Sequence, residues 1–380
     1  MRRLYLGLGE NISRETFLRL SRSSAGAVLF PRLEWLCFHV EGTEIPPSSF
    51  HLFFPPQLKY LALYPSFRVS DIPGDRVAAL VHIISFLTNS LQELILRCDQ
   101  GREPLFEDAV SSFICRHGSS LKGLNSDTPL SEAAIHHLMQ LPTLRSWFAI
   151  QEPPQTLPPV IFPSLENLYL QSAALQWLHT LTSHETDIIQ NRSTLATPHT
   201  NIRETLKFLD FPRNTIINST LLSSVAKFWN LVGLQVVGDC SGAEGCISRL
   251  TDDDVESLAA ALPRLTNVEL VKPCRHNSCK TTISSLLSLS IHCLGLKFLE
   301  IHFNTQTIVG DMRRLLDGGL GRDKAKCELW YLPAGNSPLE VRREDAETIA
   351  MGFKAIFPHL DSCNGGGEWR LVLTALAGLD

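Results

Sequence analysis

Apolar residues recur along this chain in a short pattern, Leu-x-x-Leu-x-Leu, in which other aliphatic or aromatic residues replace some of the leucines. In an extended chain the fourth and sixth positions of this pattern share one face, and the third, fifth and seventh positions share the other. Each copy therefore predicts one short strand with one apolar face. The clear copies are Leu33-Leu36-Phe38, Leu58-Leu61-Leu63, Leu91-Leu94-Leu96, Leu165-Leu168-Leu170, Leu265-Val268-Leu270 and Leu296-Leu299-Ile301.

Five weaker copies extend the pattern over most of the chain, and they begin at Met1, Leu121, Leu144, Leu206 and Leu231. The eleven copies begin between residues 1 and 296, with a mean spacing of 29.5 residues. A strand this short cannot bury its apolar face alone, so neighbouring copies must stack side by side. The spacing predicts an α/β leucine-rich-repeat solenoid, a horseshoe of irregular repeats with a parallel concave sheet and convex helices.

Segments with helical spacing of apolar residues separate the predicted strands. Proline in Phe-Pro, Pro-Pro or Leu-Pro pairs, as at Pro31 and Pro163, is expected to end the preceding helix and turn the chain into the next strand. Ser131 and the run from Thr251 to Asp254 precede apolar helices, so their side-chain oxygens are expected to cap free backbone N–H groups. The predicted helices are residues 76–87, 105–116, 132–139, 220–228, 255–262, 283–293 and 346–356.

Two regions interrupt the repeat order. Residues 184–204 are polar and rich in Thr, Asn and Ser, and we interpret them as an exposed insertion. From residue 304 the pattern weakens to a short strand at 328–332, an amphipathic helix at 343–356 and a repeat-like Phe-Pro-His-Leu at 357–360. The predicted organisation is a repeat array over residues 1–303 that contains the insertion, followed by a divergent C-terminal repeat or cap region over residues 304–380.

Composition and charge narrow the class of partner. The formal net charge of -5, from 34 basic and 39 acidic residues, creates no single-sign field that would attract nucleic acid or an anionic membrane. No apolar stretch reaches the roughly 20 residues needed to cross a bilayer, and no secretory signal follows Met1. Cysteines inside apolar runs, such as Cys37, Cys98, Cys115 and Cys293, are expected to be reduced and buried. These features indicate a cytoplasmic or nuclear protein.

The sequence contains no constellation that predicts catalysis. A Gly-x-Ser-x-Gly elbow and a phosphate-binding Gly-x-x-x-x-Gly-Lys-Ser/Thr loop are both absent from it. The best metal candidate combines Cys240, Cys246, Cys274, His276 and Cys279, but their spacing does not fit a structural zinc site, so we interpret them as unpaired loop residues. The acidic run at 252–254 precedes an apolar helix, which favours an N-cap cluster over a calcium site. We therefore expect no enzymatic activity, no metal and no cofactor.

The outward positions of the predicted strands form the candidate binding surface. Large aromatic side chains recur there, and Tyr and Trp provide much of the contact energy at protein interfaces. The competing interpretation is that some of these rings cover one another or tuck under a neighbouring loop. We predict that a protein partner binds the concave face at Tyr5, Trp35, His39, Tyr60, Tyr64, Glu93, Arg97, Tyr169, Gln171, Gln235, Glu269, Glu300 and His302, with Phe208 and Phe298 on the same face.

The Phe-Pro-x-Leu-x-x-Leu-x-Leu pattern at residues 30–38 and 162–170, the irregular spacing and the ending at 355–360 resemble fungal F-box proteins with leucine-rich repeats, over roughly residues 1–360. In that family an N-terminal F-box recruits the adaptor of a cullin-type ubiquitin ligase, and the repeats hold the substrate. The resemblance implies an F-box-like substrate-recognition module that presents a ubiquitination substrate on the concave face. Residues 1–6 already match a repeat strand, so a ligase adaptor is expected only if an upstream F-box exists. The alternative is a leucine-rich-repeat regulator of another enzyme, such as a small GTPase.

The repeats also depart from the common leucine-rich repeat at one position. Many such repeats carry an Asn three residues after the last motif leucine, and three copies of this chain have Glu41, Asp99 and Asp239 there instead. We therefore expect the loops to satisfy their backbone groups in another way.

Overall fold

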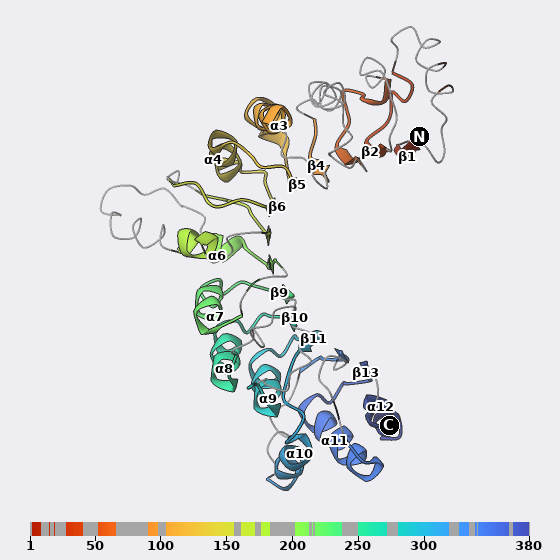
Figure 1. Cartoon of the computed structure of the whole chain (residues 1–380), viewed down its shortest axis with the longest axis vertical. Helices are drawn as coiled ribbons and strands as arrows, with labels where there is room; N and C mark the ends of the chain where they lie inside the picture. The colour runs from red at the N-terminus through yellow and green to blue at the C-terminus, as the bar shows by residue number, and fades with distance from the viewer. Residues whose placement is uncertain are drawn as a thin grey trace, which may run out of the picture. The chain divides into compact units, whose positions relative to one another are not determined.

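The computed structural model of the chain consists of two compact units. The first unit contains residues 1–173 and 187–205, and the second contains residues 174–186 and 206–380. The structure describes residues 2–8, 15, 19, 28–40, 52–65, 90–97, 104–155, 161–171, 176–182, 202–212, 215, 217–237, 250–271, 280–318, 327–333, 339, 341–364 and 368–379. Figure 1 labels the main helices and strands of both units and colours them along the chain.

Seven strands in the described part of the first unit form a parallel sheet, and each pairs with the next strand along the chain. The register aligns equivalent motif positions, so that Leu36 of one strand lies between Leu4 and Leu61 of its two neighbours. The strands are β1 (Arg3–Leu8), β2 (Trp35–Val40), β3 (Tyr60–Pro65), β4 (Glu93–Leu96), β5 (Gly123–Ser126), β6 (Ser146–Ala149) and β7 (Asn167–Leu170). The described helices of this unit include α3 (Pro104–His117), the 3-10 helix η3 (Gly118–Ser120), α4 (Glu132–Gln140) and α6 (Ile202–Thr205).

The second unit repeats the same arrangement. Its strands pair in parallel and in sequence order, and α7 to α9 lie together on one side of them (Figure 1). The strands are β8 (Phe208–Phe211), β9 (Gly233–Val237), β10 (Asn267–Val271), β11 (Phe298–Ile301), β12 (Tyr331–Pro333) and β13 (Ser362–Asn364). Its described helices include residues 176–182, α7 (Ser219–Val225), α8 (Asp252–Ala261), α9 (Ile283–His292), α10 (Ile308–Asp317), α11 (Arg343–Ile356) and α12 (Trp369–Ala377).

The core of each unit lies between the sheet and the helices. Leucines at the first, fourth and sixth motif positions are buried there, as Leu33, Leu36 and Leu299 illustrate with 0% exposure. Helices contribute their apolar faces to the same layer, with Ile114 and Leu286 fully buried. Burying one such side chain stabilises the fold by about 1.5–3 kcal/mol. A single repeat would expose these apolar side chains to water. The stacking of neighbouring repeats buries them and therefore supplies the stabilisation.

A tight turn precedes the strand in many repeats. The backbone N–H of the first motif leucine donates to the carbonyl three residues earlier, as from Leu33 to Phe30 and from Leu360 to Phe357. The proline after Phe30 then occupies the second position of the turn, which its fixed backbone angle favours. The predicted turn at the Phe-Pro pairs is thereby confirmed, and the pair at Phe357 directly follows the end of α11 (Arg343–Ile356).

Hydroxyl and thiol side chains connect these turns from one repeat to the next. Ser120 Oγ donates to the carbonyl of Leu91 at 2.8 Å, and Thr143 Oγ1 donates to the carbonyl of Leu121, also at 2.8 Å. The buried Cys327 Sγ lies 3.5 Å from the carbonyl of Leu296, within the range of a weak hydrogen bond. Side chains at the turn before the strand therefore satisfy backbone carbonyls. Glu41, Asp99 and Asp239, which replace the asparagine of the loop after the strand, lie outside the described residues.

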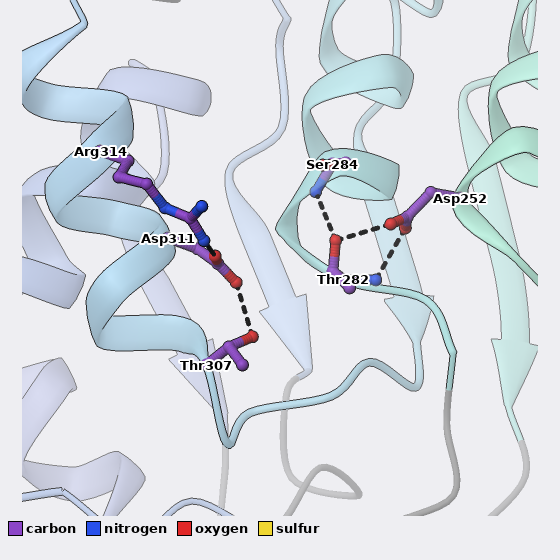
Figure 2. A network of polar contacts seen from close by, with 6 residues as sticks. All are labelled: Asp252, Thr282, Ser284, Thr307, Asp311 and Arg314. Carbon is purple, nitrogen blue, oxygen red and sulfur yellow. Dashed lines mark hydrogen bonds and ion pairs between the residues drawn. The ribbon is translucent and has the colours of Figure 1, made fainter.

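The N-terminus of α8 joins two neighbouring repeats, as Figure 2 shows. Thr251 and Asp254 cap this helix reciprocally, with Asp254 N–H donating to Thr251 Oγ1 and Thr251 N–H donating to the Asp254 carboxylate. The carboxylate of Asp252 points to the next repeat, where it accepts from the backbone N–H and the hydroxyl of Thr282, both at 2.7 Å. It also accepts from the buried Ser285 hydroxyl. The acidic run is thus a capping cluster, as predicted.

A second polar group of Figure 2 stabilises the first turn of α10. Thr307 Oγ1 donates to the Asp311 carboxylate at 2.7 Å, and Arg314 pairs with the same carboxylate. These residues belong to one helix, whereas the Asp252 contacts cross from one repeat to the next. The network at Asp311 therefore stabilises a single helix, and the network at Asp252 stabilises the contact between two repeats.

The structure confirms the leucine-rich-repeat solenoid, and each of the eleven predicted motif copies contains a strand. Two short strands, β12 and β13, extend the parallel pairing beyond the predicted array. The helices at α10 and α12 were not predicted, and α7 ends at Val225 rather than at residue 228. Cys115 is exposed, so its predicted burial is wrong; it lies on the outer side of α3. The predicted helix at 76–87, Cys98 and most of the proposed insertion at 184–204 lie outside the described residues.

Candidate functional site

The predicted binding residues lie on what we call the open face, the face of each sheet opposite to the buried fourth and sixth motif positions. Twelve of the thirteen predicted residues are exposed or half-buried there. The exception is His302, which is only 7% exposed, so the prediction that it lines the surface is wrong. Strand β11 ends at Ile301, and the carbonyl of His302 accepts from Thr281 Oγ1 at 2.6 Å. Arg97 and Gln171 also directly follow the ends of their strands but are half-buried and exposed, respectively, so alternation does not predict exposure beyond a strand end.

Five rings gather on the open face of β1, β2 and β3, and we call them the aromatic cluster: Tyr5, Trp35, His39, Tyr60 and Tyr64. Trp35 stacks on Tyr60 with ring centres 4.9 Å apart, and His39 stacks on Tyr64 at 4.6 Å. The Tyr5 ring lies between these two pairs, 5.9 Å from Trp35 and 5.4 Å from His39. Its hydroxyl is 3.2 Å from His39 Nε2, within hydrogen-bond distance. The register places these rings side by side on adjacent strands.

Small side chains at the fifth motif position let the rings pack closely. Cys37 and Ala62 occupy that position on β2 and β3, and they are 2% and 0% exposed although they lie on the open face. Rings from the flanking positions surround them, which confirms that some of the predicted residues cover one another. Tyr5 nevertheless remains 63% exposed. The cluster therefore combines a packed base with an accessible ring at its surface.

Burial within this cluster changes the chemistry of one phenol. Burial, with a smaller contribution from Tyr64, raises the pKa of Tyr60 to about 12. An ordinary tyrosine is already protonated at physiological pH, so the raised pKa extends this state to higher pH and the Tyr60 hydroxyl can donate a hydrogen bond. Together with the exposed hydroxyl of Tyr5, it gives an apolar surface with polar edges, which is the character of protein-binding tyrosines.

Charged residues follow the aromatic cluster along the sheet of the first unit. Glu93 on β4 aligns with Tyr60, and Arg97 follows the same strand. The Arg97 guanidinium carbon lies 4.8 Å from the ring centre of Phe148 on β6, a cation–π distance. Phe148 in turn aligns with the predicted Tyr169. The sequence analysis did not name Phe148, although it occupies the outward fifth position of a weaker repeat.

A different surface lies on the open face of the second unit, where acidic side chains align. Asp210, Gln235, Glu269 and Glu300 occupy the same motif position on β8, β9, β10 and β11, and the register pairs each with the next. Burial raises the pKa of Asp210 to about 6. Burial and then the charges of Glu300 and Asp210 raise the pKa of Glu269. Asp210 was not predicted, although its outward fifth position is the signal that could have identified it.

No catalytic or metal centre emerges from the residues that the structure describes. Within them, no group of three or more His, Cys, Asp or Glu side chains is placed to hold a metal ion. The five residues of the zinc candidate, between 240 and 279, lie outside the described ranges. None of the described helices is long and apolar enough to cross a membrane. The open face is therefore the strongest candidate for function.

Comparisons with known proteins show only distant likenesses. No protein-family model matches the chain, and no curated protein is similar to it in sequence. Among solved structures, Rad7 in its complex with Elc1 in yeast is similar to it with 13% identity and a TM-score of 0.39, over 94% of this chain and 84% of the other. The leucine-rich repeat-containing protein LegL7 from Legionella pneumophila is similar with 14% identity and a TM-score of 0.41, over 95% and 99%. At this distance the open face has to be interpreted from its own residues.

Proposed function

We propose that this protein is an interaction scaffold that binds a partner protein on the open face of its repeats. The observation that carries the proposal is the aromatic cluster at the start of the array. Its stacked rings provide a rigid apolar surface, and rigid Tyr and Trp side chains lose little conformational freedom when a partner binds. The exposed Tyr5 ring would make first contact, and the neighbouring Trp35 ring, which stacks on Tyr60, would extend the surface.

The test compares capture of partner proteins from the native cell by the tagged full-length chain and its variants. We expect Trp35→Ala with Tyr60→Ala to reduce the captured partner by about tenfold or more, because buried aromatic anchors contribute about 2 kcal/mol or more each at interfaces. Trp229→Ala is the matched control, because Trp229 is an exposed tryptophan in the turn before β9. Undiminished capture of every partner by the folded double variant would overturn the proposed surface.

A second variant separates binding from folding. Tyr5→Ala removes a ring that is mostly exposed, so the free energy of unfolding should change by less than about 0.5 kcal/mol. We expect this variant to keep the urea unfolding midpoint of the native protein and to capture less partner. Reduced capture with an unchanged midpoint would assign the ring to binding rather than to stability.

The specific form of the proposal is substrate recognition for a ubiquitin ligase, which the resemblance of the repeats to fungal F-box proteins suggests. Mass spectrometry of the captured material tests it. Cullin and adaptor peptides that are captured with the tagged chain and are absent without it would support this role. A small GTPase in their place would support the role of an enzyme regulator. The absence of both would leave the scaffold function and remove the ligase assignment.

A further inference from the structure

The open face of the second unit carries a row of acidic side chains that lies apart from the aromatic cluster. Asp210, Gln235, Glu269 and Glu300 lie side by side across four parallel strands. Neighbouring strands are about 4.8 Å apart, so Asp210 and Glu269, two strands apart, are separated by roughly 10 Å. The three carboxylates therefore form a line across the strands.

No described cation neutralises the first two carboxylates of this row. Lys or Arg forms no ion pair with Asp210 or Glu269 among the described residues, and their nearest charged partners within the row are each other and Glu300. Lys297, the residue before β11, instead pairs with Glu328, which is not part of the row, with 3.9 Å between Lys297 Nζ and Glu328 Oε2. Like charges held together at a partly buried surface destabilise one another, and a cationic ligand removes this repulsion.

Aromatic side chains flank the acidic row two residues earlier on the same face. The Phe208 ring is 41% exposed and covers Gly233 so closely that a Cβ there would lie 2.3 Å from the ring. Phe298 and Tyr331 are the next rings of this flanking row, with centres 6.0 Å apart. Carboxylates beside aromatic rings suit the two ends of a basic side chain, because the rings contact its apolar stem and attract its charge.

We propose that the open face of the second unit docks an extended protein segment that carries Lys or Arg side chains about three residues apart. This inference rests on the proposed scaffold function and adds the chemistry of a partner. A segment in the extended polyproline II conformation has three residues per turn and advances about 3.1 Å per residue, so side chains three residues apart share one side and lie about 9 Å apart, close to the roughly 10 Å between Asp210 and Glu269. The carboxylates of the row complement the charges of such a segment, and the rings beside them offer contact to its apolar stems.

The direct test measures binding of a synthetic peptide to the full-length chain by fluorescence anisotropy at low and physiological salt. The probe carries arginine at every third position, and its comparison peptide carries neutral citrulline at the same positions. We expect binding of the arginine peptide to weaken at least about tenfold in the double variant Asp210→Asn with Glu269→Gln, because close interfacial charge pairs are strongly coupled. Phe298→Leu, which removes a ring and keeps an apolar side chain, should weaken it several-fold.

The matched control is Glu256→Gln with Glu347→Gln, which removes the same number of charges from exposed positions on α8 and α11. This variant should bind the arginine peptide as the native chain does. Equal binding of the citrulline peptide, equal weakening by the control variant, or unchanged binding by Asp210→Asn with Glu269→Gln would each overturn the inference. Displacement of the peptide by millimolar magnesium alone would likewise show unspecific attraction of cations rather than a docking surface.

Failure of this inference is distinguishable from failure of the proposed function. If Trp35→Ala with Tyr60→Ala abolishes partner capture while the acidic variant changes neither capture nor peptide binding, the acidic face is not a docking surface and the scaffold function stands. If the acidic variant loses the peptide while the aromatic variant captures every partner, the second face binds and the aromatic cluster does not.

Discussion

The carboxylate of Asp252 should contribute more to stability than its position in an exposed helix turn suggests. It accepts three hydrogen bonds from Thr282 and Ser285 of the following repeat, which lies 30 residues or more further along the chain. In Asp252→Ala the Ser285 hydroxyl, which is fully buried, loses this acceptor. An unsatisfied buried group costs about 1–3 kcal/mol, and hydrogen bonds to a charged group contribute about 1.5–3 kcal/mol each without being additive. We therefore expect the free energy of unfolding to fall by about 2–4 kcal/mol.

Asp253→Ala is the control for this prediction. Asp253 lies in the same first turn of α8 and is exposed, so its removal has the same effect on the helix dipole without breaking the contact between repeats. The loss of one such dipole interaction costs about 0.3–1 kcal/mol. The difference between the two variants therefore isolates the inter-repeat hydrogen bonds, at about 2–3 kcal/mol. Asp252→Asn, which keeps one carbonyl acceptor, should fall between them.

Two measurements test this prediction. Urea unfolding gives the difference in free energy, and hydrogen exchange followed by NMR or mass spectrometry reports locally on the Thr282 amide, which donates to Asp252 at 2.7 Å. A loss of 2–3 kcal/mol corresponds to roughly 30- to 140-fold faster exchange of this amide in Asp252→Ala. Equal unfolding free energies for the Asp252 and Asp253 variants, together with unchanged exchange at Thr282, would refute the assignment of Asp252 as a link between repeats.

Three further predictions follow from the burial of individual side chains. Burial raises the pKa of Asp210 to about 6, so its carboxyl binds a proton more tightly in the folded than in the unfolded chain, and its contribution to stability is lost as pH rises from about 4 to 6. Asp210→Asn should therefore be more stable than the native chain at pH 8, by on the order of 1 kcal/mol after allowing for solvent screening. Urea titrations should show that this gain vanishes below pH 4. Phe162→Ala should lower the free energy of unfolding by about 3–5 kcal/mol, because this fully buried ring would leave a cavity, and a loss below 1 kcal/mol would contradict the packing. Among the described cysteines, Cys115 should react with a thiol reagent in the folded protein, whereas Cys293 and Cys363, whose pKa burial raises to about 12, should react only after unfolding, as peptide mapping can show.

The candidate surface shows how well the alternation of side chains along a strand predicts which residues are exposed on the open face. Ten of the predicted residues lie within strands and on the open face because alternate residues of a strand point to opposite sides, and Arg97 and Gln171 directly follow their strands. His302 also directly follows its strand but is buried, so alternation does not predict exposure beyond a strand end. Alternation also assigns Cys37 and Ala62 to the open face without showing that neighbouring rings bury them. Their burial depends on side chains about 30 residues away, which a local pattern does not contain.

The amino-acid sequence by itself determined the repeat, its strands, its buried leucines and the caps at Ser131 and Thr251. These features depend on residues a few positions apart, so local spacing and backbone hydrogen bonding are sufficient to predict them.

Only the tertiary structure decided which outward side chains meet. The alignment of Asp210 with Gln235 and Glu269, the stacking of Trp35 on Tyr60 and the reach of Asp252 to Thr282 all join different repeats. The repeats vary in length, so the register between their strands follows from packing of the buried leucines and turns rather than from counting residues. The physical reason is that contacts between repeats form across the sheet, where sequence separation carries no direct information about distance.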